Sequence, residues 1–319
     1  MRFSRFALLC ILAFGLLISS TYNLSAYALE FAHKTMWGEK GVAQGQFNQA
    51  SGIGVDSEDN VYVSDFAGYT TKMIQKFTPN GTFILGFGTF GNGPQYFTNP
   101  SGIAVDSDNH IFIADFGNPT YAVKEYTNNG SFVRSIGSFG LGPGLFISPG
   151  GVGVDKENNL YVTDFGENTN VQKFDPSGNY LMSIGSPGTG NGQFNNPSDV
   201  AVDSNGNIFV TDSTNNRVQK FDPSGNFLMK FGVFGIGNGQ FKQPIDIAID
   251  QSNNVYVSDS GNNRIQVFDN NGNYITQFGN TGPSHERIES PVGIALNSQG
   301  DVYVADGRDA DVHVFYPIP

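Results

Sequence analysis

The sequence predicts an all-β protein, a six-bladed β-propeller, and three observations lead to that prediction. One pattern recurs six times from Ser51 onward, with a period of 47 to 50 residues. Each copy holds four short apolar segments separated by turn residues, which is the composition of a propeller blade. The last copy lacks its fourth segment, and a matching segment stands near the start of the chain. We therefore expect four-stranded antiparallel blades in a ring that an N-terminal strand closes.

The clearest marker of each copy is a short apolar strand that ends in aspartate. Nine residues upstream of each final aspartate stands a second polar marker. The strand-ending residues are Asp65, Asp115, Asp164, Asp212, Asp259 and Asp306, and the upstream markers are Asp56, Asp106, Asp155, Asp203, Asp250 and Asn297. A residue that recurs in every blade is most simply explained by the fold, so we interpret both series as structural.

The fourth copy shows the expected order of strands within a blade. After an innermost strand we expect a second at Ile208–Thr211, a third at Arg217–Phe221 and a fourth at Phe227–Phe231. The Asn-Gly and Pro-Ser-Gly turns between such short strands favour hairpins. The first strand of each copy is small and apolar throughout, as in Gly102 to Asp106, which suits the crowded centre of a radial array.

The two ends of the chain predict how the ring closes. The sixth copy stops after its third strand, Val312 to Phe315. The segment from Trp37 to Phe47 matches the one from Phe231 to Phe241 at a constant offset. We therefore expect His33 to Trp37 to pair beside Val312 to Phe315, which removes an exposed sheet edge.

The first 28 residues have the features of a secretory signal peptide. Arg2 and Arg5 precede a thirteen-residue apolar run from Phe6 to Ile18, and Ala26 and Ala28 supply a small-x-small cleavage site. The apolar run is too short to span a bilayer comfortably. We expect residues 1–28 to be a signal peptide, residues 29–319 to form the propeller, and the protein to be secreted or periplasmic.

Composition excludes some classes of partner. The net charge is −12 at pH 7, and four of the ten lysines lie on expected third strands, namely Lys76, Lys124, Lys173 and Lys220. An acidic chain without a basic face repels phosphate backbones and anionic membranes. We expect a monomer with no nucleic-acid partner and no membrane span.

The strongest copies resemble the NHL repeat. Phe209 to Phe221 carries the pattern in full, and Tyr256 to Phe268 carries it nearly as well. The arginine of the motif is Lys72 in the first copy and Asn170 in the third. The resemblance implies a propeller whose partners meet the face of the longer connections, here called the long-loop face. The family includes protein-binding, RNA-binding and enzymatic members, so the fold does not settle the function.

Three non-repeating features are expected on the long-loop face. Phe66, Phe116 and Phe165 follow the strand-ending aspartate in the first three copies and would form an aromatic arc, exposed for binding or folded under the loops. Asp199 and Asp246 stand where the other copies have glycine, and they would either hold a calcium ion or cap backbone amides. The connection into the sixth copy is unique and carries His285.

The enzymatic interpretation is the alternative to a binding function. The resemblance implies lyases and hydrolytic propellers that hold a metal at the channel. His285 is the only histidine expected on the long-loop face, and we expect no pair of histidines to form a zinc site. We therefore predict a secreted scaffold that binds a protein or a glycan, with no catalytic residue and no obligatory cofactor. A calcium-dependent lactonase-like or lyase-like enzyme using Asp199 and Asp246 is the alternative.

Overall fold

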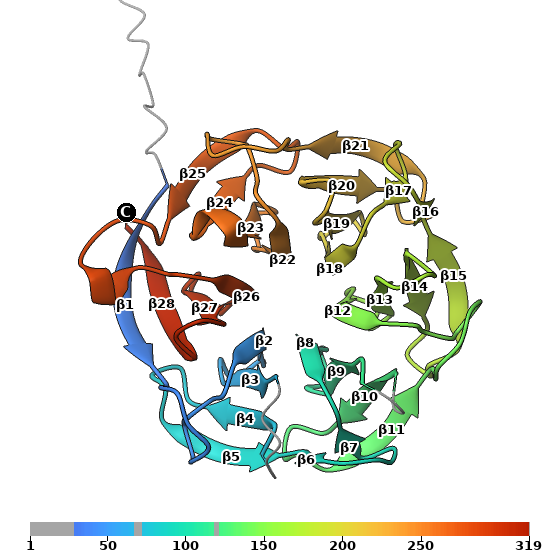
Figure 1. Ribbon diagram of the computed structural model, residues 1–319, viewed down its shortest axis with the longest axis horizontal. Helices are drawn as coiled ribbons and strands as arrows, with labels where there is room; N and C mark the ends of the chain where they lie inside the picture. The colour runs from blue at the N-terminus through green and yellow to red at the C-terminus, as the bar shows by residue number, and fades with distance from the viewer. Residues whose placement is uncertain (1–28, 67–71, 118–120, 319) are drawn as a thin grey trace, which may run out of the picture.

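The computed structural model describes residues 29–66, 72–117 and 121–318, and the expected signal peptide lies outside them. Six four-stranded antiparallel sheets surround a central axis, which confirms the predicted propeller (Figure 1). No helix in the described ranges has the length and apolar character needed to cross a membrane.

Each blade runs from an innermost to an outermost strand. The first three blades are β2 (Ala50–Val55), β3 (Val61–Asp65), β4 (Ile74–Phe77) and β5 (Phe83–Phe87); β8 (Pro100–Val105), β9 (Ile111–Asp115), β10 (Ala122–Tyr126) and β11 (Phe132–Ile136); and β12 (Pro149–Val154), β13 (Leu160–Asp164), β14 (Asn170–Phe174) and β15 (Tyr180–Ile184). The last three are β18 (Pro197–Val202), β19 (Ile208–Asp212), β20 (Arg217–Phe221) and β21 (Phe227–Phe231); β22 (Pro244–Ile249), β23 (Val255–Asp259), β24 (Arg264–Phe268) and β25 (Tyr274–Phe278); and β26 (Pro291–Leu296), β27 (Val302–Asp306), β28 (Asp311–Ile318) and β1 (Glu30–Trp37).

The ring closes as the two ends of the sequence predict. Strand β1 pairs antiparallel with β28, and Trp37 stands opposite Val312 while His33 stands opposite Phe315. The register shifts between His33 and Thr35, so β1 carries a bulge there. Figure 1 shows β1, in blue, along the outer side of β28, in red.

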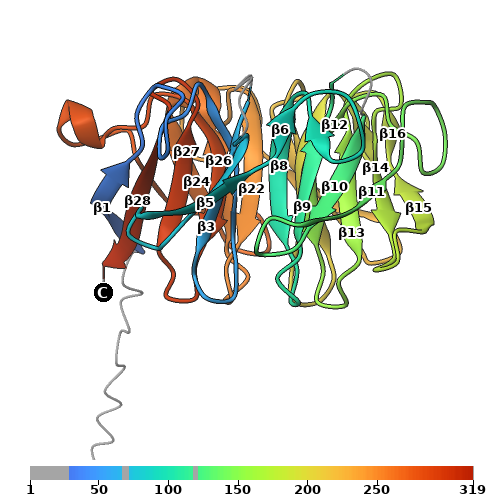
Figure 2. The same ribbon diagram turned by 90° about the horizontal axis from the view of Figure 1, so that it is seen from below.

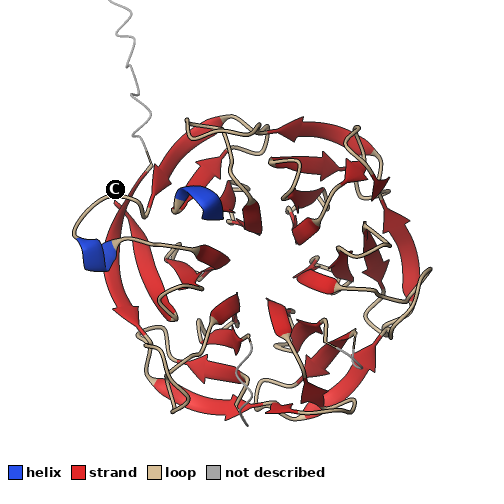
Figure 3. Cartoon of the chain, viewed as in Figure 1, coloured by secondary structure: helices blue, strands red, loops and turns tan. Residues whose placement is uncertain are grey.

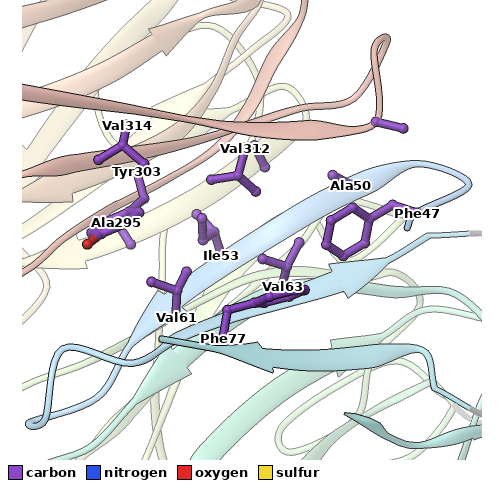
Figure 4. Close-up of a cluster of buried hydrophobic side chains, with 12 residues drawn as sticks. Phe47, Ala50, Ile53, Val61, Val63, Phe77, Ala295, Tyr303, Val312 and Val314 are labelled. Atoms are coloured by element: carbon purple, nitrogen blue, oxygen red, sulfur yellow. The ribbon is translucent and has the colours of Figure 1, made fainter. Parts of the chain in front are cut away.

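The hydrophobic core lies between the blades. The cluster at the seam joins blade one to blade six, because Phe47 and Phe77 pack with Tyr303 and Val312 (Figure 4). Trp37 of the closing strand packs against Phe77, with ring centroids 4.3 Å apart. Closure therefore buries aromatic surface and also gives the backbone groups along the edge of β28 hydrogen-bond partners.

The long-loop face carries the connections that lead from one blade into the next. These connections include the short strand pairs β6 (Thr89–Phe90) with β7 (Tyr96–Phe97) and β16 (Ser186–Pro187) with β17 (Gln193–Phe194). Figure 2 shows β6 and β16 toward the upper face and tight turns at the lower face. Each long connection ends where an innermost strand begins, so this face surrounds one end of the central channel.

Hydroxyl groups link neighbouring innermost strands near this end. Thr211 Oγ1 accepts a hydrogen bond from the backbone of Asp199 at 2.9 Å and donates one to the carbonyl of Ile245 in the next blade at 2.8 Å. Ser64 and Thr163 make the same bridge in blades one and three. The start of the innermost strands is therefore held in a fixed geometry.

The strand-ending aspartates act as structural residues. Asp212 Oδ2 accepts from Arg217 Nε at 2.8 Å, and its Oδ1 accepts from the backbone N–H of Asn195 at 2.7 Å. Asp259 pairs with Arg264 in the same way at 2.7 Å. These buried ion pairs tie the incoming connections of blades four and five to their blades, in line with the structural interpretation of the aspartates.

Candidate functional site

A cavity of about 230 Å³ opens at the end of the channel on the long-loop face. Its wall is formed by the first residues of all six innermost strands, together with Phe165. The acidic residues in this wall are Asp199 and Asp246, from adjacent blades. The cavity is therefore asymmetric, with its carboxyl groups on one side.

Glycine is required at this strand position in blades where the neighbouring strand approaches closely. A Cβ atom at Gly52 would stand 2.0 Å from the carbonyl oxygen of Ser101 in the next blade. A Cβ atom at Gly151 would stand 2.1 Å from Oδ1 of Asp199, so this carboxyl occupies the space above that glycine. The two aspartates are thus exceptions that the ring accommodates at particular places.

The two carboxyl groups bind each other and the neighbouring backbone. Asp199 Oδ2 accepts from the backbone N–H of Ile247 at 3.1 Å, and Asp246 accepts from the backbone N–H of Ile294. A side-chain hydrogen bond joins the two carboxyl groups. Such a bond needs a proton on one of the groups, so Asp199 and Asp246 form a carboxyl pair that shares a proton.

Burial is the main cause of their altered acidity. It raises the pKa of Asp246 to about 7. The pKa of Asp199 lies well above its usual value because of burial first and the negative charge of Asp246 second. The pair therefore retains a proton at neutral pH and offers both a donor and an acceptor to a ligand in the cavity.

The carboxyl pair alone would give a calcium ion only two acidic ligands. Calcium takes six to eight oxygen ligands. Within the described residues, no third histidine, cysteine or acidic side chain stands close enough to these two aspartates to form a ligand group with them. Asn196, Ser198 and Gln243, which also carry oxygen atoms, line the same cavity. In this structure the two carboxyl groups accept from backbone N–H groups and bind each other.

The three phenylalanines form a continuous row. The rings of Phe66 and Phe116 stack with centroids 5.5 Å apart, and Phe116 meets Phe165 edge to face at 5.6 Å. All three side chains are half-buried. Because Phe165 also lines the cavity, the row leads from blade one to the cavity wall in blade three, next to the blade that carries Asp199.

His285 lies apart from the other candidate residues. It belongs to the short helix η2 (Ser284–Glu286), which stands at the outer edge of the ring (Figure 3). Its side chain is 70% exposed and lies 3.7 Å from Glu286. The histidine is absent from the wall of the cavity, so the structure does not bring it to the carboxyl pair.

Exposed apolar side chains at the tips of the long connections were missed by sequence reasoning. Ile236 is 81% exposed and Phe234 is 70% exposed, and both follow β21. Phe139 and Leu141 follow β11, and Val42 follows β1. We call these five residues the apolar rim. They lie among glycines, which we had interpreted only as turn residues.

One contact between two histidines was not predicted from the sequence. Ring closure places His33 Nε2 at 3.3 Å from His313 Nδ1. Beside them, Asp306, Asp311 and His313 form a buried group whose ligand atoms lie within 4.8 Å of one another. The predicted pairing of these strands contained the signal, because residues opposite each other in neighbouring strands are close.

A second cavity, of about 530 Å³, opens at the other end of the channel. Its polar residues belong to the repeated turns, and they include Asp56, Asp106 and Asp250. The carboxylate of Asp56 accepts a hydrogen bond from the backbone N–H of Asn60, and its Oδ2 pairs with Lys76 Nζ at 3.0 Å. Since these residues recur from blade to blade and have partners, we assign this end a structural role.

Comparison with known proteins agrees with this architecture. The sequence profile of the NHL repeat matches residues 97–118, 194–221, 241–268 and 289–315. No curated protein shows significant sequence similarity to the chain.

Several solved structures share the fold. One is a protein of unknown function from Bacteroides thetaiotaomicron, with a TM-score of 0.69 and 17% identity over 91% of this chain and 77% of that one. A gluconolactonase from Xanthomonas campestris has a TM-score of 0.65 and 14% identity over 86% and 88% of the two chains. Virginiamycin B lyase from Staphylococcus aureus has a TM-score of 0.60 and 16% identity over 91% and 99%. At these identities the likeness concerns the fold alone.

Proposed function

We propose that this protein is a secreted binding protein that holds a protein partner on its long-loop face. The chain carries NHL repeats and forms a β-propeller, a fold that serves many functions. The proposal therefore rests on the particular surface of this chain. The apolar rim carries this proposal. The signal-peptide features of residues 1–28 support export.

The apolar rim is unusual for a surface of this chain. Large apolar side chains stand more than half exposed in three separate connections, as Val42, Phe139 and Ile236 do. Exposed apolar groups that gather on one face mark interaction sites more often than they arise by chance. Large apolar and aromatic side chains are also the usual anchors of protein interfaces.

The cavity gives this face a polar centre. Phe165, the last ring of the row, lines it together with the carboxyl pair. An interface with a polar, hydrogen-bonding pocket inside an apolar ring matches a partner that inserts one polar group at the centre. The apolar rim favours a protein over a glycan as the partner. A glycan bound in the cavity would not contact the rim, because none of the five rim residues lines the cavity.

Affinity capture with matched variants tests the proposal. The protein is used as bait in extracellular material of its source, and captured proteins are quantified for the wild type and two variants. Phe234→Ser with Ile236→Ser removes part of the apolar rim. Leu228→Ser is the control, because Leu228 is a 49% exposed apolar residue of the same blade but lies on strand β21 of the outer wall.

We expect the rim variant to capture at least about tenfold less of the specific partner, and the wall variant to capture as much as the wild type. Removing an interface anchor reduces the free energy of binding by about 1.4 kcal/mol or more, which corresponds to a tenfold loss of affinity. Equal capture by both variants would refute the role of the rim. Capture of oligosaccharide instead, lost on Phe165→Ala, would favour a glycan ligand in the cavity.

The carboxyl pair supports a second candidate function, that of a hydrolytic or lyase-type enzyme. A carboxyl group with a pKa near neutrality is suited to general acid–base catalysis. Two structures with this fold are a gluconolactonase and virginiamycin B lyase. We expect no turnover of lactones or esters and at most weak calcium binding. Turnover lost in Asp199→Asn and in Asp246→Asn would establish the enzyme instead.

A further inference from the structure

Blade six departs from the other NHL-type blades at the place where an arginine is expected. In blade four, Arg217 stands opposite Asp212 in the strand register, and Gln219 donates to the same carboxylate at 3.2 Å. Blade five repeats this arrangement with Arg264 and Gln266 around Asp259. In both blades a buried carboxylate is neutralised by a guanidinium and bound by an amide.

In blade six the same two positions hold an acid and a histidine. Asp311 stands opposite Asp306 in the register, and His313 follows two residues later. Asp306 is fully buried and Asp311 is 4% exposed. Two carboxylates thus face each other where other blades pair a carboxylate with a cation. Buried like charges are unfavourable unless a proton or a cation relieves them.

The side chains at this point leave a coordination position open. Asp311 Oδ1 is buried and has no hydrogen-bond partner among the described residues. It lies 3.4 Å from His313 Nε2 without forming a hydrogen bond. Asp306 receives four backbone N–H bonds, two on each oxygen, which hold its carboxylate in place. An ion bound to Asp306 therefore has to replace one of them, and the longest is the bond from Asp309 N–H to Oδ1 at 3.3 Å.

We propose that this group binds one divalent transition-metal ion, with Asp306, Asp311 and His313 as ligands and zinc as the best match. Zinc accepts histidine nitrogen and aspartate oxygen together in sites of three protein ligands and one further position. Their ligand atoms, within 4.8 Å of one another, need only a small rearrangement to meet a common ion. The ion replaces the charge that arginine supplies in blades four and five.

His33 holds the histidine ligand in the required orientation. Its Nε2 lies 3.3 Å from Nδ1 of His313, which leaves Nε2 of His313 toward Asp311. A partner on the second ring nitrogen is the usual companion of a metal-bound histidine. Because His33 lies on β1 and the ligands on β27 and β28, the ion would fasten the seam at which the ring closes.

Binding of zinc to the chelator-treated full-length protein tests the proposal. Isothermal titration with zinc chloride should show one site per chain with a Kd below about 10 µM. Manganese and calcium serve as comparison ions and should bind at least tenfold more weakly. Zinc should also raise the melting temperature by several degrees. Unfolding can be measured by the fluorescence of Trp37, the single tryptophan, which lies on β1.

The matched variant rebuilds the pattern of blade four. Asp311→Arg with His313→Gln supplies a guanidinium and an amide, so it should lose the zinc response without losing the fold. If that variant does not fold, His313→Gln alone should lower zinc affinity at least tenfold. His110→Gln is the control, because His110 lies 3.2 Å from Glu125 in another histidine–acid group.

Two results would overturn the proposal. One is the absence of zinc binding below about 100 µM in the wild type, which would mean that the group does not hold the ion. The other is a zinc response that persists in His313→Gln or disappears in His110→Gln, which would place the ion elsewhere.

Discussion

Replacing Asp246 with asparagine should make the protein more stable at high pH while leaving it nearly unchanged at low pH. Asparagine has the shape of the protonated side chain, and its amide oxygen can accept the hydrogen bond that Asp199 donates to Asp246 in the wild type. The variant therefore keeps the hydrogen bond and removes one ionisable group. In the wild type, burial raises the pKa of Asp246 from 3.8 to about 7.

The sign of the effect follows from this shift. Between pH 4 and pH 7 the unfolded chain has released the proton of Asp246 while the folded chain still binds it. The stability of the wild type therefore falls as the pH rises through this window. One pKa unit corresponds to about 1.4 kcal/mol, so the full shift corresponds to about 4 kcal/mol. Asp246 is only partly buried at the cavity wall, so we expect about 2–4 kcal/mol.

Equilibrium unfolding in urea at pH 4.5, 6 and 8, followed by Trp37 fluorescence, measures the difference. Asp56, Asp155 and Asp203 have pKa values below the usual one, and their contribution is common to both proteins. The free energy of unfolding of the variant should exceed that of the wild type increasingly as the pH rises. Parallel pH profiles for the two proteins would refute the shared proton.

Three further predictions concern closure, the aromatic row and the ion pairs. Deleting residues 29–37 should open the edge of β28 and cause aggregation with a marked drop in melting temperature; an unchanged melt would mean that the ring closes without β1. Phe116→Ala with Phe165→Ala should weaken partner binding, which a binding assay measures. Because both rings are half-buried, each substitution should also lower the free energy of unfolding by roughly half of the 3–5 kcal/mol that a fully buried phenylalanine contributes, which calorimetry measures. Arg217→Ala should cost about 3–5 kcal/mol in urea unfolding because it leaves a buried aspartate unpaired, whereas Arg308→Ala, at an exposed ion pair, should cost less than about 1 kcal/mol.

The fold could be predicted from the sequence because its determinants are local and repeated. Each blade is a set of hairpins, and the period of the strand-ending aspartates gives their number. Closure was also visible, since the segment after Trp37 matches the one after Phe231. These signals survive without any knowledge of side-chain packing.

The geometry of the candidate site needed the structure. The exceptions Asp199 and Asp246 were visible in the sequence, but their shared hydrogen bond depends on how far neighbouring innermost strands stand apart. Likewise, His285 was expected on the long-loop face, but only the structure shows that η2 holds it at the outer edge of the ring, away from the cavity wall. Loop length and direction, which decide such distances, are not encoded in the repeat.

The apolar rim and the histidine pair were missed for a different reason. Phe234 and Ile236 lie among glycines, and a glycine-rich segment predicts a turn without predicting which of its apolar side chains are exposed to solvent. His33 and His313 lie on strands that we expected to pair, but at opposite ends of the chain. Applying the predicted register to side chains as well as to strands would have brought them together.

The central claim is that the long-loop face binds a protein partner. The most direct measurement is photo-crosslinking from single positions, with a photoreactive residue at Ile236 on the apolar rim and, in a second protein, at Leu228 on the outer wall. In native extracellular material we predict one dominant crosslinked protein from position 236 and none from position 228. Crosslinks of the same protein from position 228 alone, or from neither position while the captured complex is intact, would contradict the account.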